Sequence, residues 1–270
     1  MITCSRGHAY TGSAPCPVCW PGGRKNNKNQ KRAATAGIVE AALKKIGTPK
    51  KAKASAWFFK TGKGQYGYGD VFLGVTVPEQ RMIAKEYQAL PLNEIDRLLK
   101  HPAHECRMTA LLILSRQFAA ADETARTTIV HFYLAHTSRI NNWDLVDGSA
   151  PNILGVYLLD KPRGILAELA RSNNLWERRI AILVTLAFIR RGEYEDTFAI
   201  AKILLKDPED LIQKAVGWML REVGNRSRPI EEGFLKKYAA VMPRTALRYA
   251  IEKFPEKQRK AYLAMRQLPS

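Results

Sequence analysis

From Pro78 onward, apolar residues recur along the chain with a helical period. Segments such as PEQRMIAKEYQAL (78–90), ECRMTALLILSRQF (105–118) and ARTTIVHFYLAH (125–136) place them at positions i, i+3, i+4 and i+7. This spacing is typical of amphipathic helices, and the alternation expected of strands is almost absent. The pattern therefore predicts an all-α chain.

Short breakers separate the predicted helices, among them Pro91, Pro162, Gly192 and Pro208. Successive helix pairs recur every ~35–40 residues, as expected when paired helices stack into an α-α solenoid. The sequence identity between successive helix pairs is low, so the repeat is inferred from their spacing alone. Such a stack curves, and its concave face suits a rod-shaped partner.

The N-terminal residues follow other patterns. Residues 1–20 form a cysteine–histidine cluster, and PGGRKNNKNQKR (21–32) is typical of a flexible basic linker. We therefore predict three parts: a small metal-binding segment at 1–20, a linker at 21–32, and a helical domain at 33–270.

Within the helical domain, the first helix is predicted over residues 33–45, ended by Gly47 and Pro49. The glycine-rich stretch GKGQYGYG (62–69) favours irregular structure, and an apolar turn over residues 71–77 follows it.

Positive charge is concentrated near the N-terminus. The chain has 43 Lys and Arg against 25 Asp and Glu, a formal net charge of +18, and residues 1–63 hold 13 of the basic residues but only one acid. A block of this sign typically binds a polyanion, of which DNA and RNA are the commonest. A solvated basic linker is the alternative. An acidic membrane is favoured less, because residues 33–46 lack aromatic anchors.

The longest apolar run, AILVTLAFI (181–189), is far shorter than the ~20 residues that span a bilayer. The N-terminal segment lacks the apolar core of a secretory signal. Three of the four cysteines fall within the first 19 residues, which does not resemble a disulfide framework. We expect a cytoplasmic, reducing location, associated with the nucleoid, and no membrane partner.

Cys4, His8, Cys16 and Cys19 follow the pattern C-x3-H-x7-C-x2-C. Structural zinc takes four nitrogen or sulfur ligands, and C-x2-C is a common half-site. The segment has almost no core of its own, so a bound metal would fold it. We predict structural zinc here; a tail with redox-sensitive thiols is the alternative.

Three further residues have side chains that could take part in chemistry. Cys106 falls among apolar residues and is predicted to be a small buried side chain. His101 and His104 lie at a helix junction, without further ligands near them in sequence, and are predicted to be surface or capping residues.

Two tryptophans and one acid form a candidate site. Trp143 and Asp147 in NNWDLVDG (141–148) are four apart, so on a helix they share a face. Trp218 and Arg221 are three apart and also share a face. A carboxylate with aromatic walls repels phosphate, so it is unexpected in a site that only binds DNA. It would stabilise a group that becomes positively charged, as the sugar does when an N-glycosidic bond breaks.

The same residues also allow a purely structural interpretation. Tryptophans in amphipathic helices are commonly core residues, and an aspartate near a helix start is commonly a cap. Trp176 in NLWERRIA (174–181) is assigned to packing on this basis.

Four motifs, in order and at suitable spacing, resemble the AlkD-like family of DNA alkylation repair glycosylases over residues 55–255: FLGVTVPEQR (72–81), NNWDLVDG (141–148), NLWERRIAIL (174–183) and IQKAVGWMLREVG (212–224). The resemblance implies a superhelix of HEAT-like helical pairs whose basic concave face holds duplex DNA. It also implies hydrolysis of positively charged N3- or N7-alkylated purines without a catalytic cofactor. The base need not flip into a pocket, as it does in most base-modifying enzymes; the lesion is instead exposed and held against the protein.

The resemblance also implies roles for single residues. Asp147 matches the catalytic carboxylate, which would stabilise the sugar cation and orient water. Trp143 and Trp218 match aromatics that pack against the sugar and backbone of the lesion nucleotide. Arg179, or Arg178 in a different helix register, matches an arginine near that carboxylate that contacts the DNA backbone. The remaining residues expected to bind DNA or the lesion are Arg221, Tyr66, Tyr68 and Thr76.

The leading hypothesis is a monomeric DNA glycosylase whose partner is duplex DNA with alkylated purines. Its binding should weaken steeply with salt, because phosphate contacts release counterions. The alternative is a non-enzymatic helical-repeat scaffold for nucleic acid or protein. The WDxxD motif favours the enzyme, since a scaffold has no use for an acid between aromatics on a DNA-facing surface.

Overall fold

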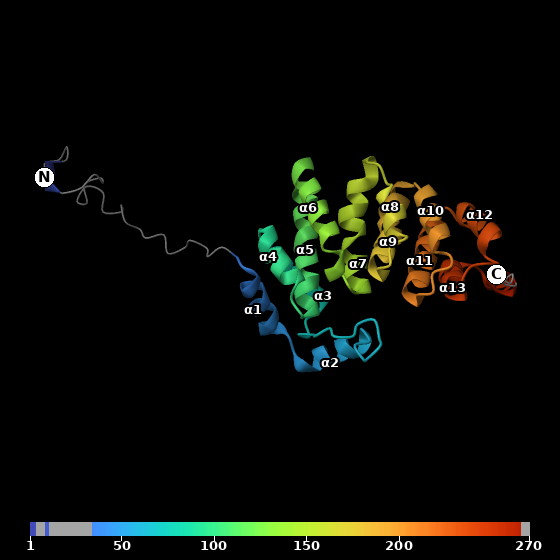
Figure 1. The fold of residues 1–270 in the computed structure, drawn as a ribbon, viewed down its shortest axis with the longest axis horizontal. Coiled ribbons are helices and arrows are strands. Elements are labelled where there is room, and N and C mark those ends of the chain that lie inside the picture. Colours follow the sequence, from blue (N-terminus) through green and yellow to red (C-terminus); the bar gives the residue numbers. More distant parts are fainter. Residues whose placement is uncertain (4–8, 11–33, 266–270) are drawn as a thin grey trace. The chain divides into compact units, whose positions relative to one another are not determined.

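The computed structural model describes residues 1–3, 9–10 and 34–265, which divide into two units, Met1–Ala34 and Thr35–Ser270. In the first unit, β1 (Ile2–Thr3) and β2 (Ala9–Tyr10) pair antiparallel, with Ile2 opposite Tyr10. In the second unit, the residues described up to 265 are built from helices (Figure 1). The prediction of an all-α domain is confirmed there.

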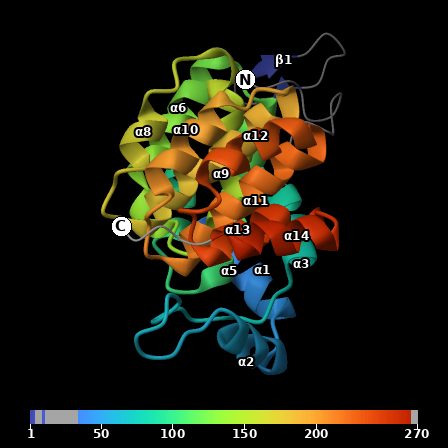
Figure 2. The same cartoon turned by 90° about the vertical axis from the view of Figure 1, so that its right-hand side faces the viewer.

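The second unit is a series of packed helices. Helices α5, α7, α9, α11 and α13 contact one another in that order, and α6, α8, α10 and α12 pack against this row. The view turned by 90° shows the later helices in front of the earlier ones (Figure 2). The helices are α1 (Ala36–Ile46), α2 (Pro49–Phe58), α3 (Val77–Glu86), α4 (Leu92–Leu99), α5 (His104–Ala120), α6 (Glu123–Ala135), α7 (Trp143–Ser149), α8 (Ile165–Leu169), α9 (Leu175–Arg191), α10 (Glu195–Leu204), α11 (Asp210–Arg226), α12 (Arg228–Tyr238), α13 (Arg244–Ala250) and α14 (Glu256–Ala264).

Short non-α turns connect several of these helices. They are the 3-10 turns η1 (Thr137–Arg139), η3 (Leu158–Asp160) and η4 (Ile251–Lys253), and the π-helical turn η2 (Pro151–Gly155).

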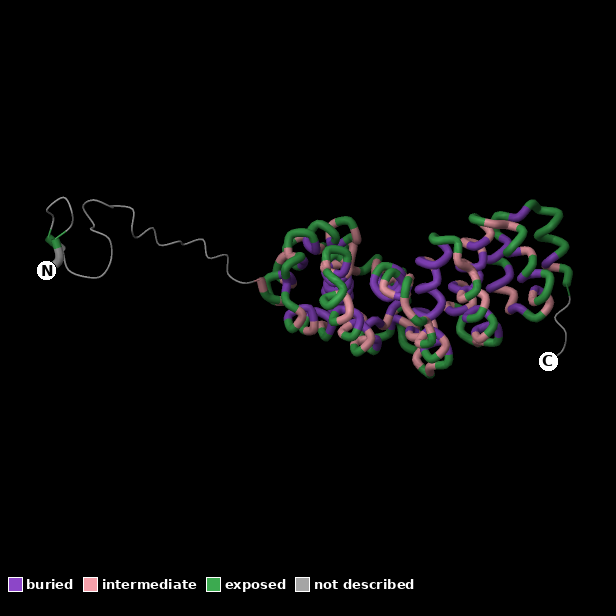
Figure 3. The backbone as a smooth tube through the Cα atoms, turned by 90° about the horizontal axis from the view of Figure 1, so that it is seen from above, coloured by how far each residue is buried: buried purple, intermediate pink, exposed green. Residues whose placement is uncertain are grey.

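Helix α9 forms the centre of the core. Ile180, Ile182, Leu183 and Val184 are all fully buried, so the helix is covered on several sides. The tube view shows this buried interior running through the helical stack, with exposed residues outside it (Figure 3). Gly192 ends α9 in the left-handed conformation, with φ of 84°, which suits a residue without a Cβ.

The start of the helical unit differs from the prediction in one respect. Helix α1 ends at Ile46, close to the predicted position, but Pro49 does more than prevent its continuation. It occupies the first position of a second helix, α2, where Thr48 caps the backbone N–H of Lys51. Proline suits this position because its ring fixes a helical φ and its missing N–H would have no helical partner. Residues 62–69 are irregular, as predicted.

The FLGV segment wraps around a buried acid. Both carboxylate oxygens of Glu105 accept hydrogen bonds from backbone N–H groups of Leu73, Gly74 and Val75, at 2.8–3.2 Å. Gly74 has φ of 80° and a Cβ there would lie 2.2 Å from the Thr48 carbonyl oxygen, so only glycine fits. This segment leads into Thr76, whose hydroxyl and N–H both donate to Glu79 at the start of α3.

Helices α11 and α13 approach closely at Gly217, and this contact gives a first testable prediction. A Cβ at Gly217 would lie 2.3 Å from the Ala246 carbonyl oxygen and 2.5 Å from Tyr249 Cβ. Gly217→Ala is therefore expected to lower the free energy of unfolding by about 1–3 kcal/mol, measured by urea denaturation. The matched control is Gly233→Ala on α12, where no atom lies within 4 Å. It should stabilise the chain slightly, and equal losses in both variants would contradict the close approach.

Candidate active site

A cavity of about 720 Å³ lies where α7, α9, α11 and α13 meet the end of α2. Its volume is within the range of small-molecule and cofactor sites. Six of the residues singled out from the sequence line it: Tyr66, Trp143, Asp147, Arg179, Trp218 and Arg221. The other lining residues are Phe58, Lys60, Glu209, Asp210, Leu211, Lys214 and Tyr249.

Asp147 and Arg179 form a two-pronged ion pair in this cavity. Arg179 Nε donates to Asp147 Oδ1 at 2.8 Å, and Nη2 donates to Oδ2 at 2.7 Å. The third guanidinium nitrogen, Nη1, donates to the Leu211 carbonyl oxygen at 2.5 Å. Every nitrogen of Arg179 is thus engaged within the protein, and the side chain fixes the orientation of the carboxylate.

Burial controls the proton affinity of Asp147. The side chain is only 16% exposed, and the loss of water raises the pKa of its carboxyl group, although the Arg179 guanidinium acts in the opposite direction. The carboxylate therefore lies in a poorly solvated place where its charge acts strongly on a nearby cation.

The neighbouring arginine, Arg178, points to a different partner. Its Nε donates to Asp207 Oδ2 at 2.6 Å, and its Nη1 donates to the carbonyl oxygens of Ser172 and Asn173. Arg178 is not among the residues that line the Asp147 cavity. The two arginines of WERR are therefore both held by aspartates, through separate pairs.

Aromatic side chains hold Trp143 in place. Its Nε1 donates to the Tyr66 hydroxyl at 3.2 Å, and Phe59 stacks on it with ring centroids 5.4 Å apart. Phe58 meets Trp143 edge-on at 5.9 Å. Trp143 lies one turn before Asp147 on α7, as the spacing predicts, and Asn142 begins that helix by accepting from the Trp143 N–H.

The other two tryptophans of the motifs occupy different environments. Trp218 lines the Asp147 cavity, and its Nε1 donates to Glu222 Oε1 at 3.0 Å. Trp176 is buried, with Tyr66 meeting its ring edge-on at 6.5 Å, so its assignment to packing is confirmed. Cys106 is likewise buried, as predicted, and burial raises the pKa of its thiol to about 12.

The prediction that His104 is a surface or capping residue is wrong. Its side chain is 3% exposed and lies between two carboxylates, with Nε2 2.8 Å from Asp144 Oδ2 and Nδ1 3.2 Å from Asp70 Oδ2. Burial disfavours the charged ring, but the hydrogen bonds that the charged ring donates to Asp144 and Asp70 outweigh it and raise the pKa of His104 to about 9. These partners lie 40 and 34 residues away, which is why the sequence did not reveal them. His101 does act as a cap, because its Nδ1 accepts from the Ala103 N–H.

Asp70 joins the glycine-rich segment to the site. Besides His104, it accepts hydrogen bonds from Arg107 Nη2 at 2.5 Å and from Asn142 Nδ2 at 3.3 Å. The segment that carries Tyr66 is therefore tied to α5 and to the residue that caps α7. This network holds the Tyr66 hydroxyl within reach of Trp143.

A second cavity adjoins the first, and a third adjoins the second. The second, of about 510 Å³, shares Phe58, Trp143 and Asp147 with the first and is also lined by Thr76. The third, of about 620 Å³, shares Arg81 with the second.

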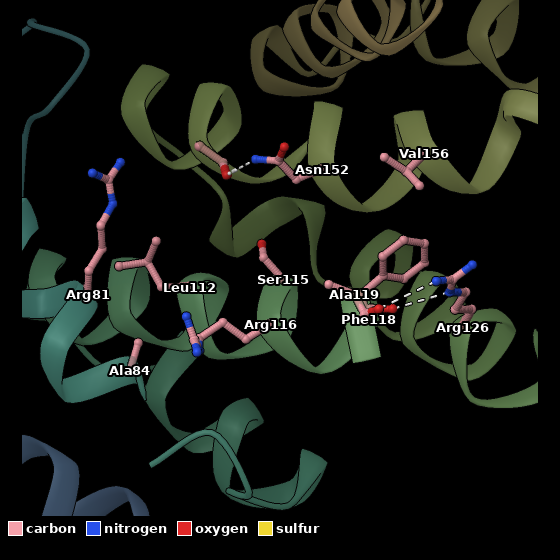
Figure 4. Close-up of a pocket in the computed structure, with 11 residues that line it drawn as sticks. Arg81, Ala84, Leu112, Ser115, Arg116, Phe118, Ala119, Arg126, Asn152 and Val156 are labelled. Carbon is pink, nitrogen blue, oxygen red and sulfur yellow. Dashed lines mark hydrogen bonds between the residues drawn. The ribbon is translucent and has the colours of Figure 1, made fainter. Parts of the chain in front are cut away.

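Arginines from three helices surround this third cavity. Figure 4 shows Arg81, Arg116 and Arg126 around it; Arg126 donates to the Phe118 carbonyl oxygen. Tyr68, which the sequence also singled out, lines none of the three cavities and is largely exposed.

The predicted zinc ligands Cys4, His8, Cys16 and Cys19 lie outside the described residues. Among the residues that are described, no cluster of three or more His, Cys, Asp or Glu side chains has a metal-binding arrangement. No helix within 34–265 is both long and apolar enough to cross a membrane.

The sequence profile of the DNA alkylation repair enzyme family matches residues 39–254, which is well over half of the chain. The chain belongs to this family. The matched region includes every helix that lines the Asp147 cavity, from α2 to α13.

A comparison with solved structures finds a protein of similar fold. A protein described as a predicted DNA alkylation repair enzyme from Enterococcus faecalis superposes with a TM-score of 0.65 at 20% sequence identity. The match covers 78% of this chain and 97% of that one. A comparison with curated proteins finds no match.

Proposed function

We propose that the chain is a DNA glycosylase that hydrolyses the N-glycosidic bond of positively charged N3- or N7-alkylated purines in duplex DNA. The observation that carries the proposal is the placement of Asp147 in one cavity with Trp143 and Trp218. A poorly solvated carboxylate between indole rings has the features that stabilise a developing cation.

In this mechanism the charge moves from the base to the sugar. The bond between the purine nitrogen and C1′ breaks, the electron pair goes to the base, and the cationic purine leaves as a neutral molecule. The deoxyribose becomes an oxocarbenium ion, which the Asp147 carboxylate stabilises. Water then adds to C1′ and releases a proton, so no general acid is needed for the leaving group.

Arg179 acts as a positioning residue in this proposal. Because all of its guanidinium nitrogens bond within the protein, it orients Asp147 rather than a DNA phosphate. Phosphate contacts fall instead to basic residues around the Asp147 cavity and the two cavities beside it: Lys60, Arg81, Arg116, Arg126, Lys214 and Arg221. Binding through these residues should weaken with salt, because each phosphate contact releases counterions.

The direct test is the release of free base from methylated duplex DNA. The purified full chain should release 7-methylguanine or 3-methyladenine faster than buffer alone, and leave abasic sites that alkali cleaves. Binding to the same DNA without release of either base would support the non-enzymatic scaffold and contradict the proposal.

A further inference from the structure

Three consecutive aromatic residues lie at the end of α2, and their exposure to solvent decreases from the first to the third. Trp57 is 83% exposed, Phe58 is 56% exposed, and Phe59 is half-buried. Helix α2 lies beside the main row of helices and has no buried residue of its own (Figures 1 and 2). An indole this open to water is unusual for a folded chain, since large apolar surface is normally covered.

These aromatics continue a column of half-buried rings that runs along the base of α2. Phe72 stacks on Phe59 with centroids 5.2 Å apart, Phe59 stacks on Trp143, and Phe58 meets Phe59 edge-on at 5.1 Å. The column therefore extends from half-buried rings, past the wall of the Asp147 cavity, to the open surface. Trp57 is the next residue in the chain.

Phe58 connects the Asp147 cavity with a hollow on the outside of α2. It lines the 720 Å³ cavity, and it also lines a hollow of about 560 Å³ together with Trp57, Lys60 and Gln65. Trp57 thus stands at the rim of the proposed active site, one residue from its wall.

The charge around Trp57 selects a polyanionic partner. Residues 41–69 contain seven lysines and no acid. Lys53, Lys60 and Lys63 are exposed, and within the part of the chain that the structure describes none of them has an ion-pair partner. Exposed rings between unpaired lysines are the arrangement that binds nucleobases and the phosphates beside them.

We propose that Trp57 stacks on a nucleobase that is displaced from the double helix at the mouth of the Asp147 cavity. The proposal rests on the proposed function, because it places DNA in that cavity. Bases inside a perfect duplex cover one another on both faces, so an indole ring can stack only on a base that has left the stack. The contact would therefore favour DNA with an unpaired base over perfectly paired DNA.

The test uses undamaged DNA, so that it does not depend on base release. Two duplexes are compared, one perfectly paired and one with a single unpaired base, for wild type, Trp57→Ala and Trp57→Phe. Trp57→Ala is expected to weaken binding to the unpaired-base duplex about tenfold and binding to the perfect duplex by less than about twofold. Trp57→Phe should retain most of the preference.

The matched control is Met82→Ala, which removes a similarly exposed apolar side chain on α3 outside the four cavities described above. It should leave both affinities unchanged. A second readout places 5-iodouracil at the unpaired position and irradiates the complex; the cross-linked peptide should contain Trp57. The proposal would be overturned if Trp57→Ala affected the two duplexes equally, if it affected neither, or if the cross-link lay elsewhere. It would also be overturned if Trp57→Ala weakened binding to vesicles of acidic lipid but left binding to both duplexes unchanged. Base release by Trp57→Ala would still report separately on the proposed function.

Discussion

Asp147→Asn is expected to lower the rate of base release by about 100- to 1,000-fold. The substitution removes the negative charge that faces the developing sugar cation, in a cavity where little water screens it. It keeps the shape of the side chain and a hydrogen bond to Arg179, so the local geometry changes little. The measurement is single-turnover release of 7-methylguanine from methylated duplex DNA.

Loss of activity in this variant has to be separated from loss of stability. Asp147→Asn leaves the buried Arg179 without its counter-ion, and breaking a buried pair costs about 3–5 kcal/mol. The matched control is Asp207→Asn, which breaks the pair between Arg178 and Asp207. Asp207 does not line the Asp147 cavity, so this variant should lose stability to a similar degree but keep base release within a few-fold. If both variants lose activity in proportion to stability, the catalytic role of Asp147 is contradicted.

The buried charge on His104 is expected to make the protein less stable as pH rises from about 6.5 to about 9. In the folded chain the pKa of His104 is about 9, above its ordinary value of 6.5, so the folded state binds more protons in this window. The stabilisation is fully present below pH 6.5 and is lost as the pH passes 9. A shift of this size corresponds to about 3 kcal/mol in the free energy of unfolding. Urea denaturation at pH 6, 7, 8 and 9 measures it.

Glu231 acts in the same direction at lower pH. Burial raises the pKa of the Glu231 carboxyl group to about 8 from its ordinary 4.5, so its contribution is lost between about pH 4.5 and 8. The pH series is therefore run on Glu231→Gln, with and without His104→Gln. The decline towards pH 9 should persist with His104 present and flatten when it is replaced. An equally steep decline in both chains would contradict the role of His104.

The parts of the site that the sequence predicted share one property: their residues are near neighbours on one helix. Trp143 and Asp147 lie one turn apart on α7, so a period of 3.6 residues places them together before any tertiary contact is known. The same holds for Trp218 and Arg221 on α11. The all-α fold followed from the same periodicity.

The parts that the sequence did not predict depend on contacts between distant helices. Arg179 lies 32 residues from Asp147. The family resemblance implies that the two are near each other, but nothing in WERR indicates that the guanidinium pairs with Asp147 itself rather than with a phosphate. His104 between Asp70 and Asp144 is a similar case, since three separate segments build one buried charged network. Helical periodicity encodes which face of a helix is apolar, but not which partner a buried polar side chain meets.

The row of helices from α5 to α13 has a consequence for the dimensions of the Asp147 cavity. Trp143, Arg179 and Trp218 project from α7, α9 and α11, and each of these helices packs on the next. The separation of the two indole rings therefore depends on two interhelical distances, that from α7 to α9 and that from α9 to α11. Substitutions that change the side-chain volume between these helices would widen or narrow the cavity, although they alter none of the polar groups that line it.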